Sequence, residues 1–144
     1  MKIITRPLFL CLLIAAGCQQ KSGEHHHQDT EENSPNQALY DEVMNIHDEV
    51  MPKMEDLYKA KVALKSKITN SPALPESEKQ KINTTLAELD SASESMMVWM
   101  RQFNPPPDSV GVDKAKAYLE KELEKVKEVK ENIQQALQKA GSVH

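Results

Sequence analysis

The sequence contains few of the residues that β-sheets and disulfide-bonded folds rely on. Of its 144 residues only 4 are glycine and 2 are cysteine, and aromatic residues make up 4%. Lys, Glu, Gln and Ala are common instead, a composition that favours long helices over a sheet. Cys11 lies in an apolar leader that we expect to be removed. Cys18 would then be the single mature cysteine, which excludes an internal disulfide.

A basic surface and the common catalytic motifs are also missing. The formal net charge is −4, and loss of Lys2 and Arg6 with the leader would bring it to −6. This acidic balance argues against a nucleic-acid partner, because phosphate recognition needs a basic face. The chain has no glycine-rich phosphate loop, and no Gly-x-Ser-x-Gly, His-Glu-x-x-His or Cys-x-x-Cys motif. We therefore predict that the protein is not an enzyme.

Residues 1–17 are typical of a bacterial lipoprotein signal peptide. Residues 8–16 (LFLCLLIAA) form an apolar run, and this run is much shorter than the roughly 20 residues that span a bilayer. Residues 14–18 (IAAGC) resemble the lipobox, in which small residues precede the cysteine that becomes the new N-terminus, although Ala15 stands where Leu is preferred. We expect Cys18 to carry acyl chains that anchor the protein in a membrane. The alternative is an ordinary secretory signal that contains a cysteine by chance.

Residues 18–33 are predicted to be the lipidated cysteine and a disordered tether. Residue 19 is Gln and not the Asp that retains lipoproteins at the inner membrane, so the resemblance implies the outer membrane. Residues 19–33 contain no Val, Ile, Leu or aromatic side chain, and such a segment cannot bury enough apolar surface to order itself. The three histidines at 25–27 could bind Zn²⁺ or Cu²⁺, but a solvated linker is the simpler interpretation because a flexible tract has no preformed geometry.

Residues 34–144 have the apolar periodicity of three helices, of which the first covers residues 35–69. The spacing of its apolar residues includes a strict heptad row, formed by Val43, Val50, Leu57 and Leu64. Pro52 interrupts the pattern and should kink or split the helix, because it has no N–H to donate to the carbonyl of Asp48.

The second helix should begin near Pro75 or Ser77 and end at Phe103, and the third should run from Val112 to the cap residue Gly141. Their apolar stripes comprise Ile82, Leu86, Leu89, Met96, Met100 and Phe103, and then Ala115, Leu119, Val126, Ile133, Leu137 and Ala140. Short connections between long helices make neighbours antiparallel. The predicted fold is an all-α, antiparallel three-helix bundle with coiled-coil-like packing, and a four-helix version broken at Pro52 is the alternative.

One histidine and six methionines of the mature chain cluster in this pattern. The methionines are Met44, Met51, Met54, Met96, Met97 and Met100. An antiparallel hairpin that turns near residue 73 places His47 opposite Trp99 and brings all six methionines into one zone. Helical phase puts His47 among the apolar residues, so we predict that its ring lies inside the bundle.

Three interpretations of this cluster stay open. The first is ordinary core, in which methionines fill irregular gaps and His47 is satisfied by Tyr118, by Ser95 or by the carbonyl that Pro52 frees. The second is a soft-metal site for Cu(I), with a nearby indole face adding cation–π attraction. Its ligands would be His47, Met51, Met54, Met96 and Met100. The third is a haem held between His47 and a facing methionine. Core is favoured, because a methionine stripe at helical spacing is usually core.

Residues 43–54 (VMNIHDEVMPKM) and 96–103 (MMVWMRQF), together with the lipobox and the charged third helix, resemble small lipoproteins of Bacteroidota that are commonly labelled "viral A-type inclusion protein". The resemblance implies an envelope location and a helical fold, and it carries over no catalytic residue. The sequence thus predicts an outer-membrane-anchored, non-catalytic helical bundle, without a cofactor, that binds an envelope protein or has a structural role. A periplasmic copper-binding protein is the alternative, and the oligomeric state is open.

Overall fold

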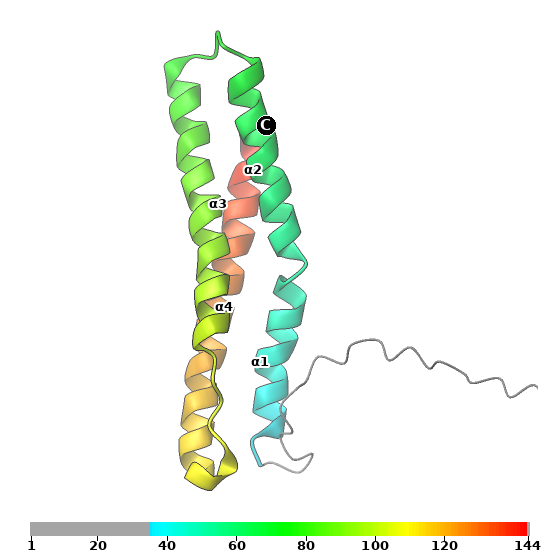
Figure 1. Ribbon diagram of the computed structural model, residues 1–144, viewed down its shortest axis with the longest axis vertical. Coiled ribbons are helices and arrows are strands. Elements are labelled where there is room, and N and C mark those ends of the chain that lie inside the picture. Colours follow the sequence, from blue (N-terminus) through cyan, green and yellow to red (C-terminus); the bar gives the residue numbers. More distant parts are fainter. Residues whose placement is uncertain (1–34, 144) are drawn as a thin grey trace, which may run out of the picture.

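The computed structural model describes residues 35–143, which form an all-helical bundle. Its elements are α1 (Gln37–Val50), α2 (Lys53–Asn70), α3 (Glu76–Gln102), the short 3₁₀-helix η1 (Asp108–Val110) and α4 (Val112–Ser142). Helices α1 and α2 follow one another along one rod, α3 returns, and α4 runs beside both, so three rods pack together (Figure 1). The predicted antiparallel three-helix bundle is confirmed. The predicted signal peptide (1–17) and tether (18–33) lie outside the described residues.

Pro52 splits the first rod into two helices without changing its buried face. Met51 and Pro52 separate α1 from α2, and Pro52 has no N–H for the carbonyl of Asp48. Met51 still has a helical backbone and donates its N–H to the carbonyl of His47 at 2.9 Å. The heptad row stays in phase across the break, because its four members are each at most 2% exposed: Val43, Val50, Leu57 and Leu64. Of the two alternatives for Pro52, the structure shows the split.

Helices α3 and α4 bury wider faces than their sequence stripes predicted. The buried face of α3 consists of Ile82, Thr85, Leu89, Ala92, Met96 and Trp99, and that of α4 consists of Ala115, Leu119, Glu122, Leu123, Val126, Val129, Ile133, Ala136 and Ala140. The predicted core residues Leu86, Met100, Phe103 and Leu137 are only partly buried. The difference arises because each helix packs against two neighbouring rods, so that small and polar residues beside the apolar stripe are covered as well.

Glu122 is a charged residue in the heptad core of α4. It lies three residues after Leu119 and four before Val126, and its side chain is only 3% exposed. Its Oε1 accepts a hydrogen bond from Nζ of Lys125 at 2.7 Å, whereas its Oε2 has no hydrogen-bond partner within residues 35–143. A buried carboxylate with one unpaired oxygen opposes folding, because desolvation removes water that no protein group replaces.

Helices α3 and α4 begin where the sequence suggested, at Glu76 and Val112, but two other predicted ends differ. Helix α1 begins at Gln37 and not at Pro35, and the amide of Asn36 donates to the carbonyl of Val112 at 3.0 Å, which joins the starts of α1 and α4. Gly141, predicted as a cap, lies inside α4. Gly111 precedes α4 with φ +102°, a backbone conformation that glycine adopts without steric cost. None of the helices within residues 35–143 has the length and apolarity that a membrane crossing requires.

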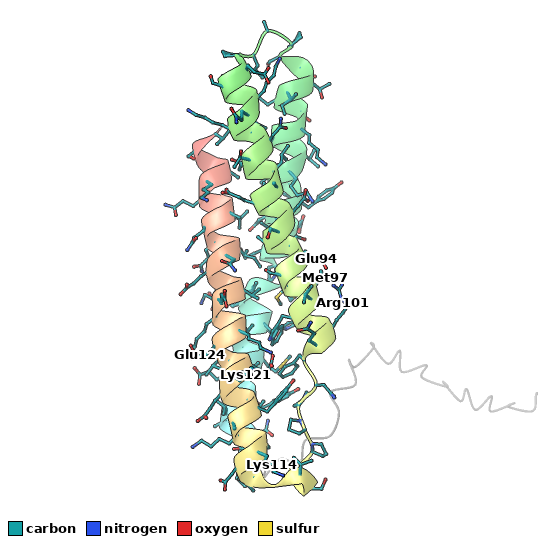
Figure 2. All side chains as sticks on the ribbon, turned by 90° about the vertical axis from the view of Figure 1, so that its left-hand side faces the viewer. Glu94, Met97, Arg101, Lys114, Lys121 and Glu124 are labelled. Carbon is teal, nitrogen blue, oxygen red and sulfur yellow. The ribbon has the colours of Figure 1, made fainter. Side chains whose placement is uncertain are left out.

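Replacing Glu122 with leucine should stabilise the protein. The free energy of unfolding is expected to rise by about 1 kcal/mol or more, because an apolar side chain fills the core position while Lys125 returns to water. Urea unfolding followed by circular dichroism measures this change. Glu124→Leu is the matched control, since Glu124 lies on the outer face of α4 (Figure 2), and its effect should stay within about 0.5 kcal/mol. A loss of stability in Glu122→Leu would contradict the account of the unpaired carboxylate.

Candidate functional site

Large rings fill the space between α1 and α3. No Cα atom of α1 lies within 8 Å of a Cα atom of α3, so the two helices meet only through side chains. Trp99 of α3 and Phe103, the residue that follows α3, stack with ring centroids 5.0 Å apart. Phe103 also lies 6.1 Å from Tyr40 of α1 and 6.3 Å from Tyr118 of α4. His47 of α1 completes the set at 6.0 Å from Trp99. These five residues are called the aromatic seam below.

His47 lies opposite Trp99, as the hairpin pairing predicted, but at the rim of the seam and not inside the bundle. Its side chain is 20% exposed. Nδ1 of its ring is 2.8 Å from Oδ1 of Asp48, whose own side chain is exposed. Because a carboxylate only accepts hydrogen bonds, Nδ1 is the donor in this bond, and Nε2 is the nitrogen that has the lone pair in a neutral ring. The seam therefore has an oriented imidazole at its edge.

Tyr118 and Ser95, two of the predicted hydrogen-bond partners of His47, bond to other groups. The hydroxyl of Tyr118 accepts from the backbone N–H of Asn104 at 2.6 Å, and the hydroxyl of Ser95 donates to the carbonyl of Ala92 at 2.7 Å. Sequence reasoning overlooked Asp48 because adjacent helical residues point about 100° apart at the backbone. At the rim of the bundle both side chains are free to bend toward each other.

The methionines of the predicted copper site divide between the core and the surface. Met96 is fully buried, and Met54 and Met100 pack against the core beside it. Met51, in contrast, is exposed at the break between α1 and α2. His47 and Met51 are thus the members of the predicted set that lie at the surface or rim.

Met97 does not join the other methionines, and the predicted convergence of all six is wrong. It lies on the outer face of α3 near Glu94 and Arg101 (Figure 2), and Oε1 of Glu94 is 2.6 Å from the Arg101 guanidinium. The reason is helical phase: Met96 and Met97 are adjacent and point about 100° apart, so only one of them can face the core.

Buried polar atoms distinguish the seam from an ordinary apolar core. Nε1 of Trp99 is buried and has no hydrogen-bond partner among the described residues. Burial raises the pKa of Tyr40 above its ordinary value, and the charge of Asp41 raises it further. Burial likewise raises the pKa of Tyr118, and the hydrogen bond from Asn104 opposes that increase. Both phenols therefore stay protonated and neutral at physiological pH.

Ion pairs along the exposed edge hold α1 against α4. Nζ of Lys130 is 2.7 Å from Oε2 of Glu49, and Nζ of Lys127 is 3.5 Å from Oε1 of Glu42. Each such exposed pair contributes at most about 1 kcal/mol. Because α1 carries four acidic residues and no Lys or Arg, these lysines of α4 also balance its charge.

Two further features of the described chain bear on binding. A groove of about 230 Å³ runs between α3 and α4 and is lined mainly by small and polar side chains, including Ser91, Ala92, Ser95, Asn132 and Gln135. Within residues 35–143, no cluster of three or more His, Cys, Asp or Glu side chains is arranged to hold a metal ion.

Comparison with known proteins returned no match to the chain among protein-family models, curated proteins or solved structures. The residues of the seam and of the outer surface are therefore the basis for assigning a function.

The neighbouring residues Met96 and Met97 should respond very differently to truncation. Met96→Ala is expected to lower the free energy of unfolding by about 2–5 kcal/mol, because it leaves a cavity in the core. Met97→Ala removes the same atoms from a side chain that is 40% exposed, and should change the free energy by less than about 0.5 kcal/mol. Urea unfolding of both variants measures the difference. Equal losses would contradict the division of the methionines between core and surface.

Proposed function

We propose that the chain is a lipid-anchored, non-catalytic helical-bundle protein of the cell envelope that binds a protein partner. The lipobox at residues 14–18 supports attachment through Cys18, and Gln19 supports the outer membrane as the site of attachment. The absence of the common catalytic motifs from the sequence supports a binding role. The small Bacteroidota lipoproteins that the sequence resembles support the same compartment.

The shape of the bundle suits a protein held at one end. Residues 37–70 form a rod of about 50 Å, calculated at 1.5 Å per residue. The start of α1 and the turn between α2 and α3 lie at opposite ends of this rod (Figure 1). An anchor at Cys18 precedes α1 in the chain, so the turn between α2 and α3 can stand well away from the membrane. This arrangement would present the side of α2 to other proteins.

An apolar stripe on the outer face of this rod is the observation that carries the proposed partner binding. Met51, Tyr58 and Val62 are 36%, 66% and 46% exposed and follow one another at spacings of seven and four residues. These spacings place them on one side of the rod. Scattered exposed apolar residues are normal, but an aligned row bordered by charges marks an interaction site. Glu55 and Lys59, paired at 2.7 Å, border it, and tyrosine is common in the buried centre of protein interfaces.

Replacing Cys18 with serine should release the protein from the membrane. We expect the wild-type chain in a bacterial host to incorporate a clickable palmitate analogue and to fractionate with the outer membrane, because acylation at Cys18 anchors it. Cys18→Ser should lose both the label and the membrane fraction. Cys11→Ser is the matched control and should behave as the wild type, since Cys11 lies in the leader. Labelling of the Cys18→Ser protein, or none of the wild type, would overturn the lipoprotein assignment.

The outer stripe can be tested by photo-crosslinking in the native host. A p-benzoylphenylalanine residue in place of Tyr58 should give one discrete adduct, because this position lies at the centre of the proposed interface. The same photo-crosslinker in place of Glu124, on the outer face of α4, is the control and should give none. Val62→Asp should reduce the adduct at position 58 at least tenfold, while the urea midpoint stays unchanged because Val62 is exposed. Absence of the adduct, or its persistence in Val62→Asp, would refute this interface.

A further inference from the structure

His47 and Met51 are placed to hold one ion between them. The N–H of Met51 donates to the carbonyl of His47 at 2.9 Å, and Met51 has helical φ and ψ of −53° and −42°. The pair therefore keeps regular i, i+4 geometry although α1 ends beside it. In this geometry the Cβ atoms lie about 5–6 Å apart, and the later side chain leans over the earlier one. Two ligands at this spacing on one helix commonly chelate a metal ion.

The imidazole of His47 is already prepared as a ligand. Oδ1 of Asp48 accepts a hydrogen bond from Nδ1 at 2.8 Å, so in the neutral ring the lone pair of Nε2 is available to an incoming ion. Histidines that bind metals typically donate their other nitrogen to a carboxylate or a carbonyl in this way. Both His47 and Met51 are partly accessible to solvent, so an ion can reach them without opening the core.

The available donors and the adjacent ring select a soft cation. Thioether sulfur and imidazole nitrogen suit Cu(I) better than the hard divalent cations, which prefer carboxylate oxygen. Met44 lies three residues before His47 on the same side of α1 and is partly buried, so it supplies a second thioether. The centroid of the Trp99 ring lies 6.0 Å from that of His47, so the indole is the aromatic ring nearest to an ion bound by His47 and can add cation–π attraction.

We infer that Nε2 of His47 and the thioethers of Met51 and Met44 bind one Cu(I) ion beside the indole of Trp99. This ligand set differs from the one that the sequence suggested, because Met54, Met96 and Met100 pack with the core. Met51 belongs both to this site and to the outer stripe, but the two tests are separate, because the interface test changes only Tyr58 and Val62. Failure of either proposal therefore leaves the other standing.

The sole tryptophan of the chain gives the site its own optical signal. The full-length protein is kept in detergent, with Cys11 and Cys18 replaced by serine so that no thiolate competes for the ion. Cu(I), added without oxygen in competition with bicinchoninate, should bind at one ion per chain. Ag(I), a redox-inert substitute, should quench the fluorescence of Trp99 with the same stoichiometry.

The variants identify the ligands one at a time. Met51→Leu removes a sulfur and nearly preserves volume, and it should weaken Cu(I) binding at least tenfold. Met97→Leu makes the same chemical change on the far side of α3 and should bind as the unaltered protein does. Asp48→Asn should weaken binding about 10–100-fold, as expected for a residue that orients a metal-bound histidine. Urea midpoints confirm that each variant remains folded.

Replacement of the three histidines at 25–27 by alanine separates the site from the histidine tract. Binding and fluorescence quenching should both survive this change. Three results would each overturn the inference. Binding could be lost in the histidine-tract variant, or Met51→Leu and Met97→Leu could bind with equal affinity. The cysteine-free parent protein could also take no Cu(I) from bicinchoninate.

Discussion

Burial of the heptad face of α4 is the interaction on which the rest of the bundle depends. This helix packs along both α1 and α3, which have no close backbone approach to each other, and it also contacts α2. Residues such as Val126 and Ile133 of α4 are fully buried between the two other rods. Because α4 sets the separation of its neighbours, the space between α1 and α3 has to be filled by large side chains. The aromatic seam is the consequence of that spacing.

The interior of the bundle also contains polar side-chain atoms among its apolar residues. Trp99 stacks on Phe103 and keeps its Nε1 without a partner, while Glu122 occupies a heptad position with one unpaired oxygen. Unsatisfied buried groups of this kind cost stability, and proteins tolerate few of them. At the open edge of the seam the cost disappears, because His47 reaches both Asp48 and water. His47 therefore lies at the rim of the seam, whereas Met54, Met96 and Met100 pack in or against the core.

Pro52 contributes a second constraint, through the backbone. The break that it causes ends α1 at Val50, and Met51, which keeps a helical backbone, is exposed there. The heptad row continues through the break, so the same side of the rod stays buried before and after Pro52. Pro52 thereby interrupts the helix on the solvent side while the packing of α1 and α2 against α4 continues on the other. This separation lets the exposed face carry Met51 without disturbing the packed face.

Much of this protein follows from the sequence alone. Periodicity is a local property, so the residues by themselves determined the helices, the buried row from Val43 to Leu64 and an interruption at Pro52, which they left open as a kink or a split. The antiparallel hairpin that the short turn implied also placed His47 opposite Trp99. Only the tertiary structure decided that Glu122 and Ala92 are core, that Met97 faces outward and that Asp48 holds His47. Each of these depends on how many neighbours a helix has and on which side they lie. A one-dimensional pattern contains no such information, because the width of a buried face is set by the helices that pack against it.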